Sequence, residues 1–272
     1  MPINFNKVPR YIRSEINRPN SVVSQGAKNR SVQRIQEWLN YHDIRTCIDS
    51  DYSSATVTCV KEFQRQNGLT INGKVNAKTW DALVNPMSNA LRQPPQLEGM
   101  SASAAVMAIA NQHVNQRPVE IGGANEGPWV RLYCKGNDGS DWAWCAGFVT
   151  LIMQQAYFYR GKKSPIKGSV SCDSLAAQAK SAGLYVSGRS IVRGEVPLSS
   201  LGECYIFLKR RTSSDWTHTG VAYGMHGLID SLVFSTIEGN TNDNGSREGY
   251  EACRRTRSLG TGKYDFIKFG EE

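Results

Sequence analysis

The chain has 272 residues, a hydrophobic content of 40% and no apolar run as long as a membrane helix, so we expect two packed domains and no stable membrane insertion. The net charge of +8 favours anionic polymers as partners. The basic residues are mostly scattered and form none of the usual nucleic-acid motifs, so we expect no nucleic acid partner. We also expect a monomer.

Residues 1–23 are predicted to form an N-terminal extension. They contain no apolar stretch of the kind that a Sec-type signal peptide requires. The sequence therefore predicts synthesis without a Sec signal peptide. If the protein acts outside the cytoplasm, another route must carry it there.

Residues 24–84 contain a near-repeat that predicts a small three-helix domain. Apolar residues recur at helical spacing in SVQRIQEWLN, and the stretches IDSDYSSAT and INGKVNAKT each place a turn before a helix. Ser31 and Ser54 are candidate N-caps. We expect Trp38 and Trp80 to lie in the core.

These blocks resemble a peptidoglycan-binding module of the three-helix kind. The resemblance rests on SVQRIQEWLN, TCVKEFQRQNGL and INGKVNAKTWDAL, which occur in this order. Residues 49–53 read DSDYS where that family usually has DGxFG, which bears on the shape of the first turn. The resemblance implies bacterial peptidoglycan as the partner. A three-helix interaction domain with another ligand is the alternative.

Residues 85–99 are predicted to be a linker, because they contain three prolines, few apolar residues and no periodicity. The pattern changes after this segment. Helices are expected from Ser101 or Ser103 onward, after Cys145 and over residues 172–183.

Six short β-like runs follow these helices, beginning at LYVS, ECYIFLKR, HTGVAYG, LVFSTIEG, EACRRTRS and YDFIKF. Helices that precede a meander of strands are typical of an α+β domain with an antiparallel sheet. We assign this fold class to residues 100–272.

Cys145 lies at the predicted start of a helix, after the turn-forming residues GNDGSD. There the unpaired backbone N–H groups and the helix dipole stabilise a thiolate, which is the reactive form of cysteine. Cys145 is therefore a candidate nucleophile. A plain buried thiol is the alternative.

A cysteine nucleophile needs a base and a group that orients the base. His218 opens the alternating strand HTGVAYG and is the candidate base. Glu238 and Asn240, two residues apart and therefore on one side of the next strand, are candidates to orient its imidazole. We expect no catalytic role for the other histidines, which are His42, His113 and His226.

The motifs WCAGFV, HTGVAYG and TIEGNTN, in this order, resemble the CHAP family of cysteine amidohydrolases/peptidases in the papain-like superfamily. The resemblance covers about residues 105–270 and departs at Gly202-Glu203, where the family often has GD. It implies that Cys145 is the nucleophile, His218 the base and Glu238 the orienting residue, with Asn240 as an auxiliary polar group. The backbone N–H of Cys145 is the natural first donor to an oxyanion.

The turn before the nucleophile contains Asn137, Asp138 and Asp141. Some CHAP domains hold calcium in that neighbourhood, and these oxygen ligands are compatible with it. A simple turn is the alternative, so we expect no required cofactor. Tryptophans flank these motifs and either line a cleft or lie in the core; they are Trp129, Trp142, Trp144 and Trp216.

The seven cysteines include no CxxC pair, which argues against a zinc site or a thioredoxin-type motif. Six can pair in an oxidising compartment, which leaves one free thiol; all seven staying reduced is the alternative. If six pair, we expect Cys145 to be the free one and Cys47 to pair with Cys59.

Together these features predict a peptidoglycan hydrolase that cuts an amide or peptide bond in the cell wall, in the periplasm or envelope. A phage-type endolysin is the expected setting. The alternatives are an antibacterial effector delivered by a specialised secretion system, a non-catalytic wall-binding protein with a degenerate domain, and a cysteine peptidase or transferase with another substrate.

Overall fold

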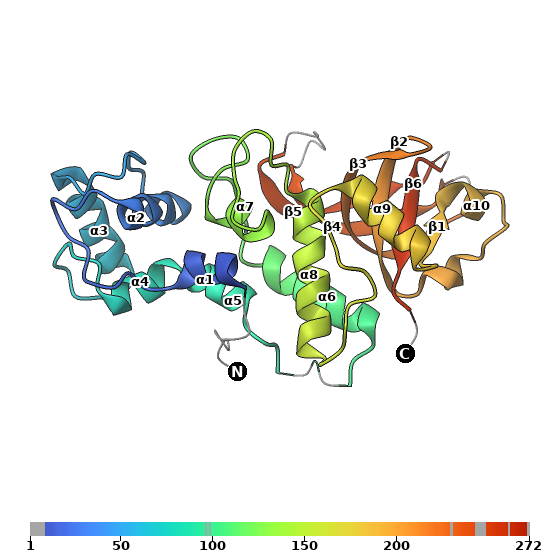
Figure 1. The fold of residues 1–272 in the computed structure, drawn as a ribbon, viewed down its shortest axis with the longest axis horizontal. Helices are drawn as coiled ribbons and strands as arrows, with labels where there is room; N and C mark the ends of the chain where they lie inside the picture. The colour runs from blue at the N-terminus through green and yellow to red at the C-terminus, as the bar shows by residue number, and fades with distance from the viewer. Residues whose placement is uncertain are drawn as a thin grey trace. The chain divides into compact units, whose positions relative to one another are not determined.

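The computed structural model contains helices and one six-stranded antiparallel sheet, which confirms the predicted α+β class (Figure 1). None of the helices that it describes is long and apolar enough to cross a membrane. The described residues are 9–95, 97, 99–228, 231–242, 249–260 and 262–270.

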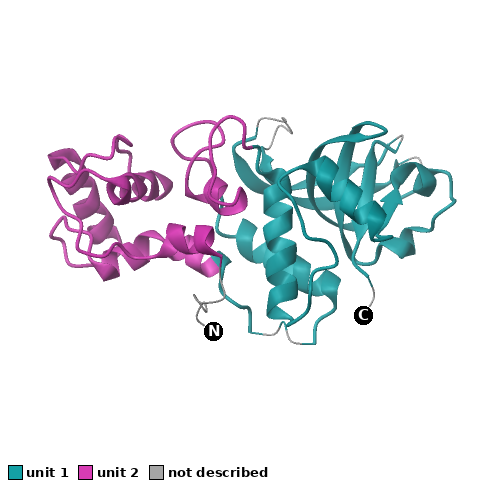
Figure 2. Cartoon of the chain, in the orientation of Figure 1, with its two compact units in different colours: residues 1–2, 90–118, 143–272 teal, residues 3–89, 119–142 magenta. Residues whose placement is uncertain are grey.

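The chain divides into two compact units, which Figure 2 distinguishes by colour. The helical unit comprises the described residues up to 89 together with 119–142, and the sheet unit comprises 90–118 and the residues from 143 onward. Residues 119–142, which the sequence analysis assigned to the domain 100–272, thus group with the helical unit.

The helical unit contains the predicted three helices and additional short ones. The three are α2 (Arg30–Tyr41), α3 (Ser54–Gln66) and α4 (Ala77–Leu83), and they are joined by α1 (Arg10–Ile16), α5 (Asn85–Ala90) and α7 (Pro128–Tyr133). The N-caps of α2 and α3 are Asn29 and Ser53, so the predicted caps Ser31 and Ser54 are wrong by one or two residues. Asn29 is the better cap because its side chain accepts hydrogen bonds from the N–H groups of Ser31 and Val32.

Trp38 and Trp80 are fully buried, as predicted. The indole N–H of Trp80 donates to the carbonyl of Ile16 at 3.0 Å, so α1 of the N-terminal extension packs onto the three-helix core.

The predicted linker is helical over its first six residues. Pro86 is the second residue of α5, a position where its missing N–H costs nothing. Met87 and Leu91, four residues apart, are buried, and so is Leu97. The prolines therefore coexist with a packed segment that begins as a helix, whereas the sequence pattern over 85–99 predicted a linker without periodicity.

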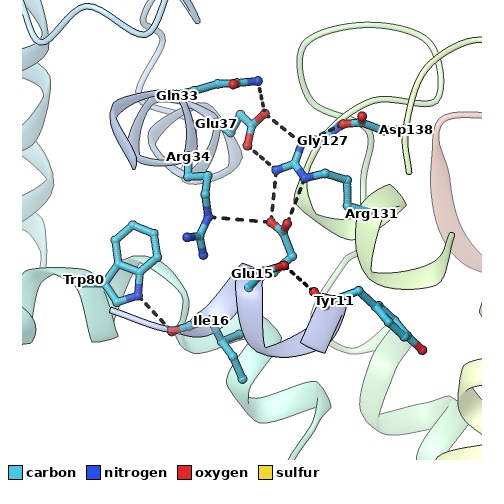
Figure 3. A network of polar contacts seen from close by, with 11 residues as sticks. Tyr11, Glu15, Ile16, Gln33, Arg34, Glu37, Trp80, Gly127, Arg131 and Asp138 are labelled. Atoms are coloured by element: carbon cyan, nitrogen blue, oxygen red, sulfur yellow. Dashed lines mark hydrogen bonds and ion pairs between the residues drawn. The ribbon is translucent and has the colours of Figure 1, made fainter. Parts of the chain in front are cut away.

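A buried ion-pair network holds the helical unit together (Figure 3). Arg131 on α7 donates to both carboxylate oxygens of Glu15 on α1, at 3.0 and 3.1 Å, and to both of Glu37 on α2, at 3.1 and 2.5 Å. It also donates to Asp138 at 2.7 Å. The side chains of Arg131, Glu15 and Glu37 are at most 4% exposed. One guanidinium thus ties the N-terminal extension and the 119–142 segment to the three-helix core.

The sheet unit has the strand order β1-β6-β2-β3-β4-β5, with every neighbouring pair antiparallel. Its strands are β1 (Tyr185–Ser187), β2 (Cys204–Thr212), β3 (Asp215–His226), β4 (Val233–Thr241), β5 (Glu251–Ser258) and β6 (Tyr264–Lys268). All six predicted β-like runs therefore form strands.

Helices cover this sheet. They are α6 (Ala102–Val114), α8 (Cys145–Tyr159), α9 (Cys172–Ser181), α10 (Gly188–Val192) and the 3-10 helix η2 (Leu198–Leu201). Helix α8 packs on α6 and against β3 and β4, and α9 packs against β3. Ser101 caps α6, as one of the two predicted alternatives.

The three other histidines, which were predicted to have no catalytic role, lie in a helix, at a helix end and at a strand end. His113 on α6 is fully buried and lies 2.9 Å from Gln155 on α8, and burial lowers its pKa to about 4. His42 ends α2 and contacts the carbonyl of Leu83, whereas His226 ends β3 and is exposed.

We predict that Arg131→Gln lowers the free energy of unfolding by about 3–5 kcal/mol, because two buried carboxylates lose their partner. Urea unfolding followed by circular dichroism measures this loss. The matched control is Arg18→Gln, which breaks an exposed pair with Asp81 and should leave the midpoint unchanged. Equal midpoints for Arg131→Gln and the parent would contradict the proposed role of the network.

Candidate active site

Cys145 is the first residue of α8, as predicted, and is only 5% exposed. The first hydrogen bond of the helix runs from the N–H of Phe148 to the carbonyl of Trp144. The preceding N–H groups therefore have no acceptor within the helix. No side chain caps this end of α8, so the helix dipole acts directly on the Cys145 sulfur.

Cys145, His218 and Glu238 come together in the sheet unit. His218 on β3 is 6% exposed, and its Nε2 lies 2.8 Å from an oxygen of the fully buried Glu238 on β4. The His218 imidazole and the Cys145 sulfur also interact, and this interaction lowers the pKa of Cys145 and raises that of His218. Since Nε2 faces the carboxylate, Nδ1 is the ring nitrogen left for the sulfur. The sequence candidates thus form a thiol–imidazole–carboxylate chain.

The charges along this chain stabilise one another. Burial opposes the charged form of His218, but hydrogen bonds and charge interactions with Cys145 and Glu238 raise its pKa to about 9. The pKa of Cys145 is held well below its usual value by its hydrogen-bond contact with Cys172, against the effect of burial, and by its interaction with the positively charged His218. Both shifts favour the ion pair of a Cys145 thiolate and a His218 imidazolium.

Arg257 on β5 completes the chain, although its sequence context gave no indication of this role. Its Nε donates to Glu238 at 2.6 Å, and its Nη2 donates to the other carboxylate oxygen. Thr236 donates to the same carboxylate at 2.5 Å. Although burial opposes ionisation, His218 and Arg257 lower the pKa of Glu238 to about 2. Glu238 is therefore an anion that accepts the Nε2–H of His218.

Two motif glycines allow these side chains to approach. A Cβ at Gly220 would lie 2.7 Å from Phe207, 2.8 Å from Cγ of Glu238 and 2.9 Å from the carbonyl of Ile237. A Cβ at Gly239 would lie 2.7–2.8 Å from Trp144 and Phe148, which surround the start of α8. A glycine is needed at position 220 because the Glu238 side chain crosses β3 there. A glycine is needed at position 239 because α8 packs closely on β4.

Asn240 lies in a distorted part of β4. The pairing with β5 shifts between Glu238 and Thr241, and Asn240 has a φ of 52°. Side chains therefore do not alternate strictly between the two faces of the sheet from Glu238 to Asn240. The prediction that both lie on one side of the strand assumed this alternation, so its basis is lost. The Asn240 side chain donates to the carbonyl of Gly249 at 2.7 Å, which closes the end of the strand.

The candidate calcium ligands belong to the helical unit. Asp138 accepts hydrogen bonds from Arg131 and from the N–H of Gly127, and Asn137 donates to the carbonyl of Cys134. A guanidinium in contact with Asp138 opposes a second cation there. The described residues, Asp141 among them, contain no group of three or more His, Cys, Asp or Glu side chains that could hold a metal ion.

The tryptophans that flank the motifs are mostly core residues. Trp129 and Trp144 are fully buried and Trp216 is 6% exposed, whereas Trp142 is half-buried.

None of the seven cysteines forms a disulfide bond in this structure. The predicted Cys47–Cys59 disulfide is not formed, and Cys59 contacts the carbonyl of Arg45 instead. Cys145 faces a second thiol, with 3.9 Å between its sulfur and that of Cys172. The sequence pattern gave no indication of this contact, because 27 residues separate the two cysteines.

The helical unit contains a polar cavity of about 610 Å³. Lys28, Arg30, Asp49 and Asp51 are among its lining residues. The first turn, which departs from the usual DGxFG pattern, thus contributes carboxylates to a cavity that also carries basic groups.

Residues 28–83 match the family model described as "Putative peptidoglycan binding domain". The match lies within the predicted module 24–84 and confirms it, and it supports peptidoglycan as the binding target and the cell wall as the place of action. No curated protein and no solved structure matches the chain.

We predict that Gly220→Ala destabilises the protein by about 1–3 kcal/mol, because the new methyl group overlaps the Ile237 carbonyl and the Glu238 side chain. The free energy of unfolding in urea measures the effect. Gly270→Ala, where a Cβ meets nothing within 4 Å, is the control and should have little effect. Equal stability of the two variants would disprove the close approach at Gly220.

Proposed function

We propose that the protein is a peptidoglycan hydrolase that cuts an amide or peptide bond with Cys145 as the nucleophile. The observation that carries the proposal is the buried Cys145–His218–Glu238 chain in a protein that also contains a peptidoglycan-binding domain. Each ionised group of the chain has an opposite charge beside it, which is the arrangement that a thiolate nucleophile and its acid need.

The first half of the proposed reaction forms a thioester. The Cys145 thiolate attacks the carbonyl carbon of the scissile bond, and the carbonyl oxygen takes up the negative charge. The backbone N–H of Cys145, at the bare start of α8, is available to this oxygen. As the tetrahedral intermediate collapses, His218 donates its Nδ1 proton to the leaving amine.

The second half releases the product. Neutral His218 takes a proton from a water molecule, which attacks the thioester carbonyl, and the Cys145 thiolate leaves. Glu238 keeps the Nε2–H of His218 in place throughout and stabilises the imidazolium each time it forms. Arg257 and Thr236 hold the carboxylate in turn.

The peptidoglycan-binding domain supports the cell wall as the substrate rather than a soluble peptide. A module that holds the chain on the wall raises the local concentration of scissile bonds. A phage-type endolysin is the biological setting that we propose, by analogy with lytic enzymes that place a binding module before a catalytic one.

We predict that Cys145→Ala abolishes hydrolysis of purified sacculi and leaves wall binding intact, because only the nucleophile is lost. His218→Ala should lower kcat/KM by about 10²–10⁴-fold, since the general acid and base is removed. Glu238→Gln should cause a smaller loss. Release of soluble muropeptides and co-sedimentation with sacculi measure the two properties.

The control for these variants is His226→Gln, which replaces an exposed histidine at the end of β3 and should keep full activity. Continued cleavage by folded Cys145→Ala, or loss of activity in His226→Gln with retention in His218→Ala, would contradict the assignment.

We also predict a bell-shaped dependence of kcat/KM on pH. The active form contains thiolate and imidazolium, so activity should fall above about pH 9, where His218 loses the proton that it gives to the leaving amine. Glu238→Gln should move this alkaline limb to lower pH, because the carboxylate helps to raise the pKa of His218. An alkaline limb near the ordinary histidine pKa of about 6.5 in the parent protein would contradict the charge pair.

A further inference from the structure

The proposed reaction leaves one nearby reactive group without a role, the thiol of Cys172. Its sulfur lies 3.9 Å from that of Cys145, which is hydrogen-bond distance for two sulfur atoms and too far for a disulfide bond. Cys172 is only 8% exposed. This thiol therefore faces the candidate nucleophile inside the protein rather than from solvent.

The fold holds Cys172 in this position from both sides. Cys172 is the first residue of α9, as Cys145 is the first residue of α8, so two helix starts converge on one pair of sulfur atoms. The hydroxyl of Ser171 caps α9 by accepting from the N–H of Ser174. Asp173 accepts from the backbone N–H of Trp216 at 2.7 Å, two residues before His218 on β3. The strand that carries the base thus also anchors the second thiol.

The surrounding charges decide which sulfur carries the proton. Cys145 faces the imidazolium of His218 and the backbone N–H of Thr219, with Glu238 and Arg257 behind the histidine. Cys172 has the carboxylate of Asp173 beside it.

The hydrogen bond to Cys145, burial and the negative charges of Cys145 and Asp173 all raise the pKa of Cys172 well above its usual value. Cys172 therefore remains a thiol, and Cys145 is the thiolate of the pair.

We propose that Cys172 is a positioning residue, whose S–H donates a hydrogen bond to the Cys145 sulfur and holds it as a thiolate in front of His218. The effect of this hydrogen bond on hydrolysis rests on the proposed function, in which Cys145 is the nucleophile. The hydrogen bond itself exists without substrate, so it can be tested separately.

Such a hydrogen bond has two opposing effects on the rate. It increases the fraction of Cys145 that is ionised at low pH, but it also makes each thiolate a weaker nucleophile, because nucleophilicity falls as the pKa falls. Loss of the donor should therefore shift the acidic limb of activity to higher pH without lowering the rate once Cys145 is fully ionised. A merely structural role would instead lower the plateau of the pH profile.

The test measures the alkylation rate of Cys145 by iodoacetamide between about pH 4 and pH 10, a range that spans the ordinary thiol pKa and the low values of activated thiols. The full chain is used in reducing buffer, and mass mapping of the Cys145 peptide separates its signal from the other thiols. Cys172→Ala should shift the midpoint upward by about one pH unit, the size expected for one hydrogen bond. Cys172→Ser, which keeps a donor, should shift it less.

An unchanged midpoint in folded Cys172→Ala would overturn the proposal, and so would a Cys172→Ser midpoint equal to that of Cys172→Ala. If the alanine variant is not folded by circular dichroism, Cys172→Val supplies the same comparison, because it fills the space without a donor. Hydrolysis of sacculi by the same proteins is the second readout, and its acidic limb should shift equally.

These two readouts distinguish a failure of the proposed function from a failure of the proposal about Cys172. A shifted alkylation midpoint in a protein whose parent does not cut sacculi would refute the proposed function and leave the hydrogen bond standing. A parent that cuts sacculi, with no shift in either profile after replacement of Cys172, would refute the role of Cys172 alone.

Discussion

The candidate site depends on the charge pair between the Cys145 sulfur and the His218 imidazole. Both side chains are almost completely buried, and an unpaired charge in such surroundings would be neutralised. The protein avoids this by extending the pair into the series Arg257, Glu238, His218 and Cys145, in which the charges alternate and sum to zero. Removal of any interior member leaves a buried charge beside an empty position.

The same constraint explains much of the local sequence. Glu238 reaches across β3 only because Gly220 has no side chain, and α8 approaches β4 closely because Gly239 has none. The uncapped start of α8 presents its N–H groups to the thiolate, where a capping carboxylate would repel it. The helical unit solves a similar problem separately, since Arg131 pairs with the buried carboxylates of Glu15 and Glu37, and Arg34 lies 3.9 Å from Glu15.

Local patterns were enough to predict the helix that begins at Cys145, the six strands and the three-helix module. Periodicity and turn residues are properties of short stretches, and the buried faces of these elements follow them. The same patterns placed His218 and Glu238 in strands, whereas their roles were inferred from the need of a cysteine nucleophile for a base and from the family resemblance. Asn240 illustrates the limit, since the irregular end of β4 breaks the alternation on which its placement relied.

Contacts between distant segments were not predictable in this way. In the sequence, Arg257 is one of three arginines in EACRRTRS, and nothing distinguishes it from the others. Its contact with Glu238 becomes visible only when β5 pairs with β4. The contact between Cys172 and Cys145 likewise becomes visible only in the fold, where the first residues of α8 and α9 lie side by side. Residues 119–142 contact the rest of the helical unit through Arg131, whose partners lie 94 and 116 residues away in the sequence, and through Trp129, which packs on Trp38.

The most direct test of the charge pair is the ultraviolet absorbance of the Cys145 thiolate, measured as the difference between the parent protein and Cys145→Ala across pH. At about pH 6 an ordinary thiol is protonated, so a thiolate signal there reports stabilisation by the site. The account predicts this signal in the parent at about pH 6 and its loss in a His218→Ala background. A difference spectrum without thiolate at that pH, or one that persists unchanged without His218, would contradict the account.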